Sequence, residues 1–237
     1  MIEWRDQGIV LGLKSFGEKD GIVYILTQNH GCHAGVVRGI KSKKNQFLQI
    51  GVVVTCQWKA RLSEHLGSWS LEPEKSYLAL FLSDSSKLQI LSLAAQLTCQ
   101  LLPERHPYPN FFDFWRKFLE KLSDIPSGAG SYVLFERYLL QELGFGLKLN
   151  SCAVTRSQEN LSYVSPKTGC AVTQDVGAPY QERLLALPEF LIKEEECSEK
   201  EEIIKGLDLT GYFLIKQFPE PKYKRLFEAR QRFIESL

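Results

Sequence analysis

Short segments in which hydrophobic and polar residues alternate fill the amino-terminal third of the chain. They are rich in β-branched residues and are separated by glycines and polar turns, which is typical of strands. The predicted strands are Gly8–Leu11, Gly21–Thr27, Ala34–Arg38, Gly51–Leu62 and Ser68–Leu71. Short strands in this number and spacing favour a small Greek-key barrel, for which the OB-fold is the commonest five-stranded solution.

The strand predicted at Gly51–Leu62 has the clearest alternation. One set of side chains can fill a barrel: Val52, Val54, Cys56, Trp58, Ala60 and Leu62. The other set is mostly polar and ends in two cations: Val53, Thr55, Gln57, Lys59 and Arg61. Trp58 is therefore expected in the core, whereas Trp4 and Trp69 can either lie in the core or stack on bases.

The hydrophobic period becomes helical after about Leu78. Helices are predicted over Leu88–Leu102, over Phe111–Leu122, from Ser127-Gly128 to Gly144, and over Glu182–Ile192, Glu199–Phe218 and Lys222–Leu237. The segment 150–180 is rich in Gly, Pro, Ser and Thr and is expected to be irregular. The pattern predicts an α+β protein with an OB-fold barrel over residues 1–80 and a mainly helical domain over 81–237 that carries this insert.

Composition is that of a globular protein, with 44% hydrophobic residues and nearly balanced charge, 29 basic against 28 acidic residues. No apolar run approaches the roughly 20 residues needed to cross a bilayer. The first residues lack the organisation of a secretory signal, so we expect a cytoplasmic protein. The six cysteines are scattered without short-spaced pairs, which argues against a disulfide framework.

The placement of charge changes this picture. The stretch from Gly21 to Ser63 contains no Asp or Glu. Its cations are Arg38, Lys41, Lys43, Lys44, Lys59 and Arg61, and these are the candidate DNA-binding residues. A loop and a strand face of this kind can form a cationic groove that follows a nucleic-acid backbone. A solvated basic face that keeps the domain in solution is the alternative interpretation.

Candidate catalytic and metal-binding residues are few. A strand would place His33 on the face opposite His30 and Cys32, and no acid lies nearby in the sequence to orient a histidine, so we expect a structural role. Cys152 and Cys170 supply half of a tetrahedral zinc site. The sequence contains no nucleophile motif and no phosphate-binding glycine-rich loop, so neither a metal site nor an enzyme is predicted.

The helix predicted after Gly128 carries an apolar stripe with a cation beside it. The stripe comprises Tyr132, Phe135, Leu139 and Leu143, and the cation is Arg137. These residues either pack against other helices in the core or line a groove for a short hydrophobic, acidic peptide.

Several segments resemble, in order, one known family. They are Trp4–Leu11, His30–Gly39, Trp58–Gly67, Glu142–Leu147, Cys152–Thr155, Tyr163–Lys167 and Gly206–Gly211. Together they resemble the RecO family, the bacterial recombination mediators of the RecF pathway. The similarity covers nearly the whole chain, which makes it more specific than any single segment.

The resemblance implies an amino-terminal OB-fold, a helical domain and no cofactor-dependent chemistry. It implies binding and annealing of single- and double-stranded DNA, with Arg38 as a DNA contact. It also implies partnership with RecR and with the acidic tail of the single-stranded DNA-binding protein SSB, so that RecA is loaded onto SSB-coated DNA. The stripe at Tyr132, Phe135, Arg137 and Leu139 is the candidate site for that tail. A scaffold whose barrel docks an acidic protein instead of DNA is the alternative.

One departure from the family concerns zinc. Many relatives bind a structural zinc through two CxxC pairs in the segment that corresponds to 150–180. Here Cys152 matches the first ligand, whereas Thr155, Thr173 and Val176 stand at the positions of the others, and Cys170 falls on a glycine position. We therefore expect no zinc, and hydrogen bonds and packing must hold the segment.

Overall fold

The computed structural model describes residues 1–125 and 128–237, apart from the side chain of Ala79. Contacts divide the chain into two compact units, Met1–Ile125 and Pro126–Leu237.

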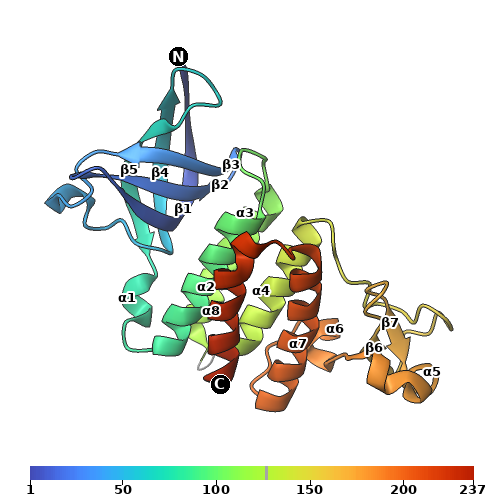
Figure 1. Cartoon of the computed structure of the whole chain (residues 1–237). Helices are drawn as coiled ribbons and strands as arrows, with labels where there is room; N and C mark the ends of the chain where they lie inside the picture. Colours follow the sequence, from blue (N-terminus) through green and yellow to red (C-terminus); the bar gives the residue numbers. More distant parts are fainter. Residues whose placement is uncertain (126–127) are drawn as a thin grey trace. The chain divides into compact units, whose positions relative to one another are not determined.

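Strands of the first unit form a closed barrel in the order β1-β2-β3-β5-β4 (Figure 1). The strands are β1 (Ile2–Phe16), β2 (Asp20–Thr27), β3 (Gly31–Val37), β4 (Val52–Ala60) and β5 (Gly67–Ser76). β1 pairs antiparallel with both β2 and β4, and β3 pairs parallel with β5. This is the connectivity of an OB-fold, so the predicted fold class is confirmed.

The parallel seam between β3 and β5 is short and depends on glycine. Gly35 lies opposite Gly67. A Cβ atom on Gly67 would lie 2.2 Å from the Trp58 ring, and one on Gly35 would lie 2.6 Å from the Trp69 ring. Both indoles are almost fully buried and donate hydrogen bonds to backbone carbonyl oxygens. The seam therefore closes over two tryptophans that leave no room for a side chain at either glycine.

The alternation predicted for β4 is largely confirmed. Val54, Cys56 and Trp58 are buried in the barrel core, whereas Thr55 is exposed and Lys59 is half-buried. Two positions differ: Leu62, predicted to face inward, is exposed because β4 ends at Ala60, and Val53, predicted to face outward, is buried.

Helices complete the first unit: α1 (Leu78–Phe81), α2 (Ser85–Leu101) and α3 (Pro109–Asp124). Asp84 caps α2 because its carboxylate accepts a hydrogen bond from the Lys87 backbone N–H at 3.1 Å. α2 packs on β1, and Gly51 at the start of β4 lies against Leu91 of α2. The strands thus end at Ser76, but the compact unit continues to Ile125.

The second unit is mainly helical. Its helices are α4 (Ala129–Glu142), α5 (Gln174–Gly177), α6 (Glu189–Lys193), α7 (Lys200–Gln217) and α8 (Lys224–Glu235). A small sheet in the order β7-β6-β8 comprises β6 (Leu161–Val164), β7 (Ala171–Thr173) and β8 (Leu185–Ala186). Short 3₁₀ helices span η2 (Ala178–Arg183) and η3 (Pro221–Tyr223). The segment predicted as irregular therefore contains β6, β7 and α5.

Two boundaries of this unit need comment. The predicted helix start at Ser127 lies outside the described residues. The single helix predicted over Glu182–Ile192 is wrong, because the segment comprises the end of η2, then β8, then α6. β8 pairs with the edge of β6, and Pro188 precedes the first residue of α6. Tertiary pairing and proline thus override the helical hydrophobic spacing.

A buried ion pair joins α4, α7 and α8. Arg230 Nε donates to Glu136 Oε1 at 2.6 Å, and Thr210 Oγ1 donates to Glu136 Oε2 at 2.5 Å. Burial lowers the pKa of Arg230, but the carboxylate of Glu136 outweighs it and raises the net value. Removal of either charge would leave the other buried without its partner, which is strongly destabilising.

Candidate nucleic-acid interface

A groove of about 550 Å³ lies on the barrel beside the β3–β5 seam. Its cations are Arg5, Arg38 and Lys44, and its single acidic lining residue among those described is Glu72. Neutral polar side chains also line it: Ser42, Asn45, Thr55, Gln57, Ser68 and Ser70. These cations and polar groups suit a phosphate backbone.

Strand register explains the wall of the groove. Arg5 of β1 lies opposite Gln57 of β4, which lies opposite Ser70 of β5. Residues that pair across neighbouring strands share a face, so these side chains form one row on the outer wall. Arg5 was missed in the sequence because its strand extends beyond the predicted β-branched core, Gly8–Leu11.

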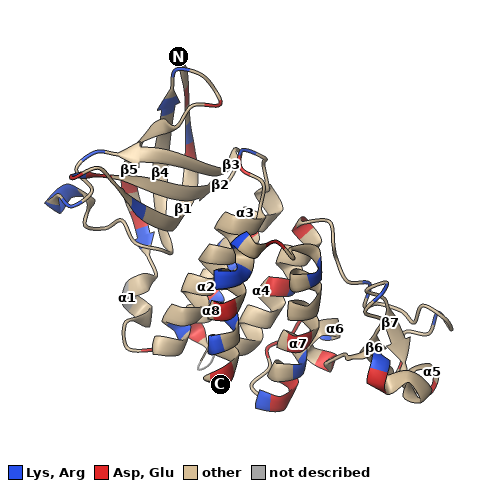
Figure 2. Cartoon of the chain, in the orientation of Figure 1, with Lys and Arg blue, Asp and Glu red and all other residues tan. Residues whose placement is uncertain are grey.

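The predicted DNA-binding residues divide into two sets. Arg38, Lys41, Lys43 and Lys44 belong to what we call the basic loop, residues 38–45, which contains the 3₁₀ turn η1 (Lys43–Asn45). All four cations are at least partly exposed, and η1 is the blue turn beside the barrel in Figure 2. Of these, Arg38 and Lys44 line the groove.

The other predicted cations lie outside the groove lining. Lys59 Nζ forms an ion pair with Glu3 Oε1 at 3.0 Å, with both side chains partly exposed. Arg61 is exposed in the loop between β4 and β5. A pair in solvent such as Lys59–Glu3 is weak, so both cations can still contribute to the field of the barrel.

Asn45 anchors the basic loop. Its side-chain Nδ2 donates to the backbone oxygens of Arg38 at 3.0 Å and Gly39 at 3.1 Å. Ser42 N also donates to Gly39 O at 2.8 Å. These hydrogen bonds hold the loop in one conformation next to Arg38, which lowers the entropy cost of binding a ligand.

The basic loop is also tied to the hairpin formed by β1 and β2. Gly39, which has a φ of 60°, donates its N–H to Asp20 Oδ1 at 2.8 Å. Ile40 N donates to Lys19 O at 2.9 Å, and Ile40 packs against the barrel core.

Trp69 lines the groove but does not present a free ring to it. Trp69 is 6% exposed and lies in the core. One face of Trp4 stacks on His30 with 3.9 Å between ring centroids, and Trp4 also stacks with Trp58 at 5.6 Å. Both rings that were open in the sequence analysis are therefore packed within the protein.

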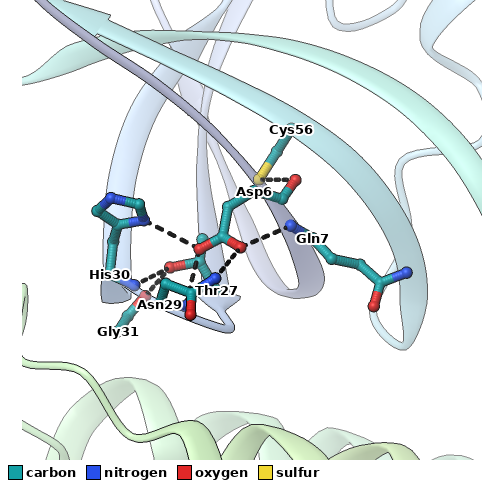
Figure 3. Close-up of polar contacts among 7 residues, drawn as sticks. All are labelled: Asp6, Gln7, Thr27, Asn29, His30, Gly31 and Cys56. Atoms are coloured by element: carbon teal, nitrogen blue, oxygen red, sulfur yellow. Dashed lines mark hydrogen bonds and ion pairs between the residues drawn. The ribbon is translucent and has the colours of Figure 1, made fainter.

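Asp6 organises the turn between β2 and β3 (Figure 3). Its carboxylate accepts hydrogen bonds from Asn29 N at 2.8 Å, Asn29 Nδ2 at 2.9 Å and Gln7 N at 2.9 Å. It also lies 2.9 Å from His30 Nδ1. Asp6 is 24 residues from His30 in the sequence, and strand pairing brings it there from β1. Burial, followed by the charge of Arg105, lowers the pKa of His33 to about 4. These contacts support the structural role expected for the histidines.

The Cys152 segment keeps its turn through hydrogen bonds. Cys152 Sγ accepts from Thr173 N at 3.5 Å and lies 3.7 Å from Thr173 Oγ1. Burial opposes ionisation of Cys152, but hydrogen bonds from the Thr155 side chain and from backbone N–H groups lower its pKa to about 6. The groups beside the Cys152 thiol thus belong to Thr155 and Thr173, and hydroxyl groups are poor zinc ligands. Across residues 1–125 and 128–237, no three His, Cys, Asp or Glu side chains are grouped to hold a metal ion.

The candidate peptide stripe requires correction. Tyr132, Phe135 and Leu139 are completely buried in α4, and Arg137 pairs with Glu194 at 2.7 Å. They cannot line an open groove in this conformation, so helix packing, the alternative interpretation, describes them. One reason is that Phe233 of α8 packs edge-on against Tyr132, with 5.5 Å between the ring centroids.

Fold and groove together define an OB-fold protein with a cationic surface suited to a polyanion. Residues 1–77 match the family model described as "Recombination protein O N terminal", and residues 82–226 match "Recombination protein O C terminal". The chain therefore belongs to the RecO family, as the resemblance implied, and has a role in DNA repair and recombination.

Similar curated proteins are named "DNA repair protein RecO". The protein of Rhodospirillum rubrum is 42% identical, over 100% of this chain and 97% of its own length. Those of Afipia carboxidovorans and Brucella abortus are 41% and 39% identical, each over 100% of this chain and 96% of their own. In the described parts of the chain, no helix is long and apolar enough to cross a membrane.

Proposed function

We propose that the barrel binds DNA along the groove and the basic loop, and that the protein is a recombination mediator without catalytic activity. One observation carries this proposal: Arg5 on β1 and Arg38 and Lys44 on the basic loop converge on one groove. Each phosphate that they neutralise releases condensed counterions, which drives binding.

The chemistry of the lining favours interaction with the DNA backbone. Hydroxyl and amide groups such as those of Ser70 and Gln57 bind phosphate and sugar oxygens, which position DNA without reading its sequence. Two complementary strands held on such a surface repel each other less, and this would promote annealing.

The partners of the family are proposed for this chain on family membership alone. RecR would act with it, and the acidic, hydrophobic tail of SSB would tether SSB-coated DNA to it, raising the effective concentration of DNA at the barrel. RecA would then receive the DNA. Because the stripe at Tyr132 is buried, we assign the tail to exposed residues of the second unit, of which Tyr212 and Ile215 on α7, beside Lys216, combine apolar surface with a cation.

A fluorescence titration with labelled single-stranded DNA at several salt concentrations tests the DNA-binding proposal. Replacement of Lys41, Lys43 and Lys44 by Gln should weaken binding. It should also reduce the slope of log affinity against log salt by roughly 0.7 to 0.9 for each phosphate that the variant no longer neutralises.

The control replaces Lys193, Lys205 and Lys222, which pair with acids in the second unit, by Gln. It makes the same change in net charge and should leave the slope unaltered. An unchanged slope for the basic-loop variant would remove the loop from the interface. Absence of DNA binding at low salt, combined with binding of an acidic protein, would favour the scaffold function instead.

A further inference from the structure

The tip of the hairpin formed by β1 and β2 carries an exposed aromatic ring that has no assigned role. Phe16, the last residue of β1, has 48% of its surface exposed. The turn continues through Gly17, which has a φ of 65°. At this exposure the ring is available to a ligand.

Strand register places Phe16 on the outer face of the barrel. Phe16 lies opposite Asp20, and Lys14 lies opposite Ile22, which lies opposite Val36 of β3. Residues two apart on a strand share a face, so Phe16 and Lys14 lie on the same face as Val36. Val36 lines the cationic groove.

Cations lie on the strand that carries this ring and in the basic loop that is bonded to its hairpin. Lys14 shares its face, and Arg38 follows Val36 by two residues. The hydrogen bonds from Gly39 to Asp20 and from Ile40 to Lys19 hold the tip of the hairpin against the basic loop. The local acids are Glu18, which is exposed at the tip, and Asp20, whose carboxylate already accepts the Gly39 N–H.

We propose that Phe16 is a stacking platform for a base of single-stranded DNA whose phosphates lie on the basic loop. The inference rests on the proposed DNA binding and adds an interaction with bases. An exposed aromatic ring beside a cationic track is the usual combination in proteins that bind single strands. Bases in a duplex are already stacked on each other, so Phe16 favours single strands.

The test compares Phe16→Ala with the wild-type protein in titrations of a single-stranded oligonucleotide, a duplex, and a single strand of equal length that lacks bases. We expect Phe16→Ala to reduce affinity for the normal single strand about 5- to 150-fold, the range that base stacking on an aromatic residue contributes. Affinity for the abasic strand and for the duplex should not change. The salt slope should also stay constant, because no charge is removed.

Two further variants make the test specific. Phe16→Trp should restore binding and should quench the fluorescence of 2-aminopurine in the bound strand. Leu13→Ala is the matched control, since Leu13 is exposed on the same hairpin but lies opposite Val23, which faces the barrel core, and it should bind normally.

Different results would contradict base stacking on Phe16 and DNA binding by the basic loop. Equal reductions for Phe16→Ala on normal and abasic strands, or no reduction on either, would overturn the stacking role. If the basic-loop variant still shows a reduced salt slope in that case, DNA binding at the loop stands. If the wild-type protein binds no DNA at low salt, both proposals fail.

Discussion

One amide side chain contributes two of the hydrogen bonds that hold the basic loop. Asn45 bonds to two carbonyl oxygens at the end of β3, and this holds Arg38 and Lys44 on the same groove. Because Asn45 is uncharged, its role differs from that of the lysines, and the two can be separated by experiment.

Replacement of Asn45 by Ala should lower affinity for single-stranded DNA about two- to tenfold, the worth of the hydrogen bonds that it removes. The salt slope should stay the same, since every cation remains. Titrations at several salt concentrations measure both quantities. Asn29→Ala is the matched control, because Asn29 makes an equivalent side-chain bond to Asp6 at another turn. A similar decrease in both variants would indicate general destabilisation of the barrel instead of loop positioning.

Most inward-facing residues of β4 could be predicted from the sequence, although Leu62 is exposed and Val53 is buried against expectation, whereas groove residues could be predicted only in part. Trp58 was identified because it alternates with Val54 and Cys56. Arg5 and Phe16 were missed because they lie near the two ends of β1, outside its β-branched centre, where alternation carries no signal. For Tyr132 the sequence identified an apolar helix face correctly, but the spacing of apolar residues does not show whether another helix covers that face.

At the scale of elements, helices and strands with a clear period of hydrophobic residues were predicted from the sequence. Elements that form only by hydrogen bonding to a distant segment were not. β8 is the clearest example, because its two residues become a strand only by adding to the edge of β6. The insert around Cys152 belongs to the same class, since hydrogen bonds between segments far apart in the chain define its turns.

Metal analysis of the purified protein should find less than one zinc per chain, and a chelator should leave its melting temperature unchanged, because the insert lacks a ligand set. Cys152→Ser should lower the melting temperature more than Cys170→Ser. The reason is that Cys152 is completely buried and accepts the Thr173 N–H, whereas Cys170 is partly exposed. Stoichiometric zinc would overturn this interpretation of the threonines.

At the scale of the whole molecule, the boundary between family models and the boundary between compact units differ. The models meet between residues 77 and 82, whereas contacts divide the chain after Ile125. The difference arises because α2 packs on β1 and so belongs physically with the barrel. The helical domain expected over residues 81–237 thus begins with helices that complete the first unit.

Reversal of charge at Lys59 and Arg61 tests whether the activities of the two units are independent. Lys59→Glu combined with Arg61→Glu should weaken DNA binding, though less than changes at Arg38 and Lys44, because neither residue lines the groove. Binding of an SSB tail peptide should be unaffected. Fluorescence titrations with each ligand measure the two effects, and simultaneous disappearance of both would argue for a shared site or for misfolding.

The short pairing of β3 with β5 has a mechanical consequence. This pairing has the fewest paired residues of any pair of neighbouring strands in the barrel. The groove is lined by residues from both of these strands, Val36 of β3 and Ser68 of β5. A ligand that contacts both strands would cross-link them. Its binding would make the barrel more rigid at this seam, and its dissociation would allow the two strands to separate transiently again.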